Sequence, residues 1–389
     1  GLVGSRTPYG ATRNSFDPDY ISGGSSGGSA VAVAKGQVSF SLGTDTAGSG
    51  RVPAAFNNLV GIKPTRGLLS ATGVVPACRT LDTVSIFALD MADAQAVLRV
   101  CAAYDPGDAY ARPAETGPAP RSAFRFGVPR QLERVGDGEA ERRVVAAGAR
   151  LEALGGEAED LDFAPFLAAA RLLYEGPWVA ERYAAIQAFI EARPEALFPV
   201  TRRIIEPGIQ ASAVAAFQAQ YRLAELKREC DGLMAGLDFV LTPTAGTLYT
   251  RAQVAAEPIA LNSNLGHYTN FMNLLDYAAV AVPTGFAANG LPYGVTLFAP
   301  AFADAALAHY GDRLHRDLGL TLGATGHPRP DAPLVADTPP PEPTTRLVVC
   351  GAHLSGLALN HQLTERGGRL VTATESAPAY RLYALDRKS

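Results

Sequence analysis

Residues 22–51 read SGGSSGGSAVAVAKGQVSFSLGTDTAGSGR, and this stretch decides the fold of the chain. It contains two loops rich in glycine and serine, SGGSSGG and TDTAGSG, joined by an Ala/Val-rich run and a strand-like segment at residues 38–42. Apolar runs of this length predict a short buried helix and a buried strand that hold the two loops against each other. The sequence therefore predicts one site built from both loops.

The second loop is suited to a nucleophile. Ser49 follows the expected strand and precedes the apolar run 52–56, so it stands at a turn among small residues. Such a turn exposes a hydroxyl and leaves backbone N–H groups free to stabilise a negatively charged oxygen. The first loop lets two backbones approach closely and turns Ser25 and Ser26 toward a neighbour. A phosphate-binding loop is the weaker interpretation, because neither GxGxxG nor GxxxxGK[ST] occurs; a linker would not lead directly into apolar segments.

The run GGSSGGSA, followed by GTDTAGSGRVPAAFNNLVGIKPTRG, resembles the signature region of the amidase signature family, serine hydrolases with a Ser, cis-Ser, Lys triad. The resemblance implies an α/β fold with a mixed central sheet surrounded by helices. It also implies that Ser49 is the nucleophile and Ser25 the bridging serine, with a cis peptide between Gly24 and Ser25. The implied oxyanion hole consists of the backbone N–H groups of Thr46, Ala47, Gly48 and Ser49. Asp45 and Arg51 also match the family pattern, and we expect a charged pair that braces the loop.

The lysine of the triad has no counterpart here. In the family it lies well upstream of the bridging serine, and only 24 residues precede Ser25. The four lysines are Lys35, Lys63, Lys227 and Lys388, none at the matching position. We therefore expect the sequence to be an N-terminally shortened piece of a longer protein. Without a base Ser49 stays a weak nucleophile, so this piece alone is expected to be nearly inactive.

The bulk composition excludes several classes of function. The chain has 389 residues, 47% of them hydrophobic, enough for one large domain and a second element. Its net charge of −4 gives no electrostatic case for nucleic acid or an anionic membrane, and no apolar run reaches about 18 residues. The four cysteines lack CxxC spacing and the six histidines lack HExxH spacing. We expect reduced thiols, a cytoplasmic protein, no metal and no cofactor.

Strands and helices alternate along the remaining chain, which predicts an α/β domain over residues 1–321. A helix should begin after Asp90, because this capping residue precedes apolar residues at helical spacing. Further expected elements are a surface loop at 105–122, a strand FRFGVPR, a helix EAERRVVAAGARLEALGG, a long helix from about 211, a strand FVLTPTAG and a last helix at 301–319.

The stretch YEGPWVAER carries the information about substrate. The break at residues 176–177 argues that Tyr174 and Arg182 turn into one pocket, and a guanidinium beside a phenol suits a small carboxylate. Spacing alone favours an ordinary amphipathic helix instead. However, the stretch resembles the one by which allophanate hydrolases hold the carboxylate and amide ends of their substrate. This resemblance implies that Tyr174 and Arg182 bind substrate.

A Pro-rich segment at 322–345 predicts an extended linker and a domain boundary. Beyond it, RLVVCGAHLSGLALNHQLTERGGRL resembles the start of the C-terminal domain of allophanate hydrolases, an α+β domain similar in fold to γ-glutamyl cyclotransferases. We expect residues 346–389 to be a shortened form of that domain. His353 and His361 are its candidate site residues, although a lone histidine is more often structural.

The resemblance implies hydrolysis of the small molecule allophanate, with release of ammonia and carbon dioxide, in urea or triazine breakdown. Another amidase of the family, including the glutaminase subunit of the tRNA-dependent amidotransferase, is the first alternative. Such an enzyme would share both serine loops but need neither YEGPWVAER nor the C-terminal module. A catalytically inactive fragment or scaffold without the lysine is the second alternative. A homodimer stays open, since no stretch indicates an interface.

Overall fold

The structure, a computed structural model, describes residues 1–7, 9–132, 138–330, 355–356 and 358–365. The chain divides into two compact units, Gly1–Leu334 and Val335–Ser389. The described part of the second unit contains one short helix, α13 (His361–Thr364). Its expected γ-glutamyl-cyclotransferase-like fold falls largely on residues outside the described ones.

The first unit is built around one mixed sheet of eight strands in the order β1-β3-β2-β7-β8-β6-β4-β5. β4 pairs in parallel with β5 and β6, whereas the other neighbours are antiparallel. This arrangement confirms the predicted mixed central sheet. The strands are β1 (Phe40–Asp45), β2 (Val60–Lys63), β3 (Thr83–Ala88), β4 (Phe124–Pro129), β5 (Gly156–Leu161), β6 (Phe239–Pro243), β7 (Tyr277–Phe286) and β8 (Pro292–Pro300).

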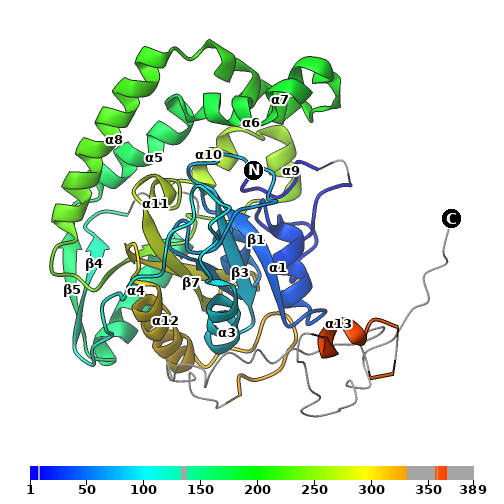
Figure 1. Cartoon of the computed structure of the whole chain (residues 1–389). Helices are drawn as coiled ribbons and strands as arrows, with labels where there is room; N and C mark the ends of the chain where they lie inside the picture. Colours follow the sequence, from blue (N-terminus) through cyan, green and yellow to red (C-terminus); the bar gives the residue numbers. More distant parts are fainter. Residues whose placement is uncertain (8, 133–137, 331–354, 357, 366–389) are drawn as a thin grey trace. The chain divides into compact units, whose positions relative to one another are not determined.

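Helices cover both faces of this sheet, with α5, α6, α7 and α8 grouped on one side and α3, α4 and α12 on the other (Figure 1). The α-helices of this unit are α1 (Gly27–Ala34), α2 (Val52–Phe56), α3 (Met91–Cys101), α4 (Glu139–Ala153), α5 (Ala164–Glu175), α6 (Trp178–Ala192), α7 (Pro199–Ile205), α8 (Ala213–Leu233), α9 (Arg251–Ala256), α10 (Ala260–Leu265), α11 (Phe271–Leu274) and α12 (Asp304–Leu318). Within the described residues, no helix has the length and apolar character needed to cross a bilayer.

The central strand β7 shows why two cores form. Ala278, Val280 and Val282 pack into the core with α3, α4 and α12. Tyr277 and Ala279 point to the opposite face, into the core with α5, α8 and α11. Because successive side chains of a strand alternate between faces, a strand that is apolar throughout is buried on both sides.

The helix after Asp90 begins where the sequence predicts. The Asp90 side chain accepts a hydrogen bond of 2.9 Å from the backbone N–H of Asp93, and α3 follows at once. The cap satisfies one of the N–H groups that a helix start leaves without an intrahelical partner. The expected start of this helix is therefore confirmed.

The strand after the first loop differs from its prediction. It begins at residue 40 rather than 38, continues to Asp45, and lies at the end of the strand order. Phe40 and Leu42 are 47% and 46% exposed, so the expectation of a buried strand is wrong. An end strand has a neighbour on one side only, here β3, and so can stay open to solvent.

The first part of the expected linker also differs from its prediction. Residues 322–330 are packed against the first unit rather than extended away from it. The N–H of Ala324 donates to the carbonyl of Ala34, and the side-chain amide of Asn58 donates to Gly323. These contacts satisfy polar groups of the core, which is why this segment belongs to the domain. Residues 331–345 lie outside the described part.

Candidate active site

Residues 46–51, between β1 and α2, form the loop that carries the candidate nucleophile Ser49, and we call it the nucleophile loop. It is folded around the carboxylate of Asp45, the last residue of β1. One carboxylate oxygen accepts the N–H of Gly48 at 2.8 Å, and the other accepts the N–H of Gly50 at 3.0 Å. Arg51 donates from Nε and Nη2, each at 2.9 Å. Both side chains are fully buried. The predicted charged pair that braces this loop is confirmed.

Neighbouring groups stabilise the charges of both Asp45 and Arg51. Burial by itself would raise the pKa of Asp45, but the Arg51 guanidinium and the Gly50 N–H hold that pKa below its ordinary value. Arg51 reaches further, to the carbonyl of Thr269 at 3.2 Å and the side-chain oxygen of Asn273 at 3.3 Å. A buried ion pair with these additional hydrogen bonds fixes the loop between β1 and α2.

Ser49 lies in this loop and is 8% exposed. Its neighbour Gly48, one of the four predicted oxyanion donors, directs its N–H to Asp45 in this structure. The physical reason is that a buried carboxylate needs donors for both oxygens. For the N–H groups of Thr46, Ala47 and Ser49, no hydrogen bond occurs among the described residues.

The first serine loop, residues 22–28, contacts the same strand β1 through Ser26. The Gly24–Ser25 peptide is cis, as the resemblance implies. Ser26 Oγ accepts the N–H of Thr44 at 3.1 Å and lies 3.2 Å from the Thr44 carbonyl oxygen, to which it donates. Thr44 directly precedes Asp45, so the two loops are anchored at adjacent residues of β1.

Ser25 is exposed and lines a groove of about 560 Å³ together with residues of β1, β3 and the segment 69–74. No hydrogen bond joins Ser25 to Ser49 within the described residues. Two of the three described lysines have other partners: Lys63 Nζ donates to the Pro64 carbonyl at 2.9 Å, and Lys227 pairs with Asp231. Burial lowers the pKa of Lys63 to about 8.

Tyr174 and Arg182 are brought together as the sequence predicts. α5 ends at Glu175 and α6 begins at Trp178, so the chain does break at Gly176 and Pro177. The Arg182 guanidinium lies 5.1 Å from the centre of the Tyr174 ring, and Nη2 is 3.5 Å from its hydroxyl. Burial opposes the charge on Arg182, whereas the neighbouring Tyr174 and nearby acidic groups raise its pKa above the ordinary value.

This pair adjoins the nucleophile loop through an apolar cluster. Its buried members are Ala47, Cys78, Leu81, Leu173, Trp178, Ala219 and Leu274, with Tyr174 packed against them. Ala47 comes from the nucleophile loop and Trp178 from the start of α6. The Nε of Arg182 is buried and has no hydrogen-bond partner among the described residues. An open donor of this kind is available for an anion.

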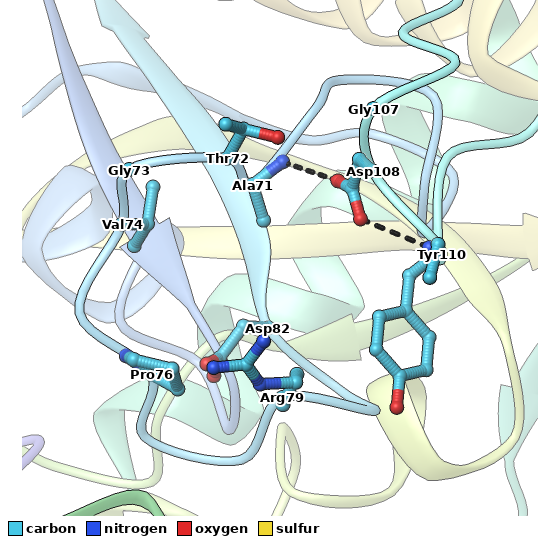
Figure 2. Close-up of a pocket in the computed structure, with 11 residues that line it drawn as sticks. Ala71, Thr72, Gly73, Val74, Pro76, Arg79, Asp82, Gly107, Asp108 and Tyr110 are labelled. Atoms are coloured by element: carbon cyan, nitrogen blue, oxygen red, sulfur yellow. Dashed lines mark hydrogen bonds between the residues drawn. The ribbon is translucent and has the colours of Figure 1, made fainter.

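Asp82 belongs to this site but has no signal in the sequence. Its carboxylate accepts from Thr46 Oγ1 at 2.5 Å, so it contacts the nucleophile loop directly. Asp82 and Arg79 line a cavity of about 320 Å³ together with residues 71–74, 76 and 107–110, and Figure 2 draws these lining residues. An isolated aspartate in a loop is ordinary, and only the folded chain places it beside Thr46.

The histidine candidates of the second unit form no described site. His353 lies outside the described residues. His361 is exposed at the start of α13, with Nδ1 2.9 Å from the carbonyl oxygen of Ala358. Among the residues that the structure describes, no group of three or more His, Cys, Asp or Glu side chains is placed to hold a metal ion.

Gly48 has a conformation that other residues rarely adopt, which gives a first prediction. Its φ is +133°, and a Cβ there would lie 2.4 Å from Thr269 Oγ1. We expect Gly48→Ala in the full-length protein to displace the loop that carries Ser49 and to reduce the activity proposed below at least about 10²-fold, the scale of losing an oxyanion donor. The matched control is Gly28→Ala in α1, where a Cβ meets nothing within 4 Å. Equal activity of both variants would contradict this account of the loop.

Known proteins share this fold and this family. Residues 1–308 match the Amidase family, and residues 345–389 match the allophanate hydrolase C-terminal domain. The chain belongs to the amidase family. The family assignment made from the two serine loops is thereby confirmed.

Individual members of this family are similar to the chain over much of its length. The chain is 42% identical to urea amidolyase of Saccharomyces cerevisiae, over all of this chain and 22% of that protein. It matches the structure of Kluyveromyces lactis allophanate hydrolase with a TM-score of 0.82 and 40% identity, over 94% of this chain and 61% of that one. It is also 33% identical to a glutamyl-tRNA(Gln) amidotransferase subunit from a Synechococcus strain, over 84% of this chain and 73% of that protein. The chain thus spans about a fifth of the urea amidolyase.

Proposed function

We propose that the protein is an allophanate hydrolase that cleaves the terminal amide of allophanate, releasing ammonia and finally carbon dioxide. The observation that carries this proposal is the Tyr174–Arg182 pair, whose tyrosine packs against the apolar cluster that contains Ala47 of the nucleophile loop. Allophanate has a carboxylate at one end and an amide at the other. A guanidinium near a serine nucleophile matches both ends of such a molecule.

In the proposed mechanism the Ser49 oxygen attacks the amide carbon while its proton passes to Ser25. The free N–H groups of the nucleophile loop stabilise the negative oxygen. The carbon–nitrogen bond then breaks, the relay returns a proton to the nitrogen, and ammonia leaves. Water resolves the acyl-enzyme by the same route. The resemblance assigns the final proton acceptor to a lysine, and none of the lysines of this sequence stands at the matching position.

Two alternatives remain for the activity. An amidase of other specificity, such as a glutaminase subunit, would share the Asp45–Arg51 brace and both serines. The match of residues 345–389 to the allophanate hydrolase C-terminal domain favours the proposed substrate. A catalytically inactive scaffold is the other alternative. A full-length sequence without a lysine at the position of the family's catalytic lysine would favour it.

The proposal extends to partners and location. We propose a small-molecule substrate and no nucleic-acid or membrane partner, in line with the net charge of −4. The described cysteines Cys78, Cys101 and Cys230 are free, which suits the cytoplasm. Burial raises the pKa of Cys78 to about 12, so this thiol is suited to packing rather than chemistry. A homodimer stays a prediction.

Replacing the carboxylate-binding arginine tests the proposed substrate. We expect Arg182→Ala in the full-length protein to raise KM for allophanate about 10- to 100-fold, the equivalent of losing hydrogen bonds to a charged group. The value of kcat should change much less, because Arg182 contacts the carboxylate and not the reacting amide. Ammonia release measured against allophanate, biuret and glutamine gives both constants.

The control for this variant is Arg171→Ala, which removes an exposed arginine from α5. It should leave both constants unchanged. Turnover of glutamine or another amide with no turnover of allophanate would overturn the proposed substrate and leave the family assignment intact.

A further inference from the structure

We propose that Glu181 is a positioning residue, which holds Arg182 at a fixed place relative to the nucleophile loop through the turn at residues 78–82. This inference rests on the proposed function, since it concerns the distance between Ser49 and the Tyr174–Arg182 pair. We call this pair the carboxylate clamp. Glu181 lies within YEGPWVAER, but that stretch predicts a role only for Tyr174 and Arg182, and the turn carries no motif. Their role comes from a chain of hydrogen bonds that joins α6 to β1.

The first link ties the turn to the nucleophile loop. Asp82 accepts from Thr46 Oγ1, and it also accepts the N–H groups of Ala77 at 2.8 Å and Cys78 at 3.1 Å. The same carboxylate therefore closes the turn on itself and fastens it to Thr46. Thr46 is the residue directly after Asp45, around which the whole loop is folded.

The second link ties the turn to α6. Glu181 accepts the N–H of Thr80 at 2.7 Å on one oxygen and Thr80 Oγ1 at 2.8 Å on the other. Cys78 Sγ lies 3.7 Å from the carbonyl oxygen of Trp178, which is the first residue of the helix. Glu181 directly precedes Arg182, so whatever holds Glu181 also holds the backbone that carries the guanidinium.

A third contact prevents the turn from moving as a unit. The side-chain amide of Asn273, which is fully buried, donates to the carbonyls of Asp45 at 2.7 Å and Leu81 at 3.0 Å. The turn is thus attached to β1, to α6 and, through Asn273, to α11. With all three attachments in place, the distance from the carboxylate clamp to Ser49 is set by the protein before substrate binds. Such preorganisation is what positions a small substrate for attack.

An effect of the Glu181 charge alone and a positioning role predict opposite changes in substrate binding when Glu181 is removed. Glu181 and Asp82 are among the acidic groups that raise the pKa of Arg182, so they lie within its electrostatic reach. If Glu181 acted only through its negative charge, removing that charge would strengthen binding of an anionic substrate. If Glu181 positions Arg182, removing its contacts weakens binding. The sign of the change therefore separates the two roles.

The experiment uses the full-length protein and three single variants. Glu181→Ala removes the contacts and the charge, whereas Thr80→Val removes one hydrogen bond without changing any charge. Glu191→Ala is the matched control, because this glutamate of the same helix bonds only to Tyr183 and Gln187 among the described residues. Calorimetry measures the Kd of malonamate, in which a CH₂ replaces the central NH of allophanate. Ammonia release gives KM and kcat for allophanate.

We expect the Kd of malonamate and KM for allophanate to rise about 10-fold in Glu181→Ala and about 3-fold in Thr80→Val, on the scale of one or two hydrogen bonds. The value of kcat and the thermal unfolding midpoint should stay close to wild type, which a general loss of structure would not allow. Glu191→Ala should match wild type in every measurement.

Tighter malonamate binding in Glu181→Ala with no change in Thr80→Val would overturn the positioning role in favour of a field effect. Unchanged binding in both variants, or parallel losses of kcat and stability, would also overturn it. A wild-type protein that neither binds malonamate nor hydrolyses allophanate would instead overturn the proposed function itself. The two failures are therefore distinguishable.

Discussion

Ser49→Ala is expected to reduce hydrolysis of allophanate by the full-length protein about 10⁴- to 10⁶-fold, the scale seen when a serine nucleophile is removed. Alanine keeps the backbone N–H of this residue and fits the same loop, so only the nucleophilic oxygen is lost. Substrate binding should persist, because the Arg182 guanidinium is untouched. Ammonia release measures the loss, and calorimetry with malonamate shows that the site is still formed.

The control for this variant is Ser29→Ala in the first serine loop region. Ser29 Oγ donates to the carbonyl of Leu42 at 3.0 Å and lies on α1 rather than in the nucleophile loop. We expect near wild-type turnover for it. Residual activity of Ser49→Ala within about 10-fold of wild type would be far above the 10⁴-fold scale of nucleophile removal and would place the nucleophile elsewhere.

Asp45→Asn is expected to lower the free energy of unfolding by about 3–5 kcal/mol, because it leaves the Arg51 charge buried without its partner. The asparagine amide would also turn a donor toward the N–H groups of Gly50 or Arg51, which the carboxylate accepts in the wild type. Urea unfolding at neutral pH measures the effect. Glu225→Gln in the exposed Arg222–Glu225 pair is the control, since exposed ion pairs contribute about 0–1 kcal/mol.

Asp45 also makes the stability of the fold depend on pH in a predictable direction. The pKa of Asp45 is lower in the folded state than its ordinary value. Its contribution to stability is therefore complete above the unfolded pKa of about 3.9 and is lost as the pH falls through the lower folded value. The difference in stability between wild type and Asp45→Asn should shrink below about pH 4. A difference that stays constant on acidification would contradict the role of the Asp45 charge.

Local patterns in the sequence predicted most of the framework. The alternating strands and helices, the cap at Asp90, and the break at Gly176 and Pro177 are each decided by a few neighbouring residues. The two serine loops predicted the family because their small residues and spacing are specific. The hydrogen bond from the Gly48 N–H to Asp45 could not be predicted from the sequence, because it depends on how the loop closes.

The residues that sequence reasoning missed are those whose partners are distant along the chain. Asp82 bonds to Thr46, Glu181 bonds to Thr80, and Asn273 joins Asp45 to Leu81. Asp82 and Asn273 are of an ordinary type with no spacing that marks them, and YEGPWVAER, which contains Glu181, predicted a role only for Tyr174 and Arg182. Their importance arises only after packing has brought α6 and α11 to the end of β1.

Short motifs in the sequence established the family, and they predict Ser49 as the nucleophile, Ser25 as the bridging serine and Tyr174 with Arg182 as the substrate-binding pair. These are the features encoded by short contiguous motifs and their resemblance. The tertiary structure decided that β1 is an open end strand, that residues 322–330 belong to the domain, and that one turn connects the carboxylate clamp to the nucleophile loop. Long-range contacts make these decisions, because the burial and hydrogen bonding of a residue depend on neighbours that its local sequence does not specify.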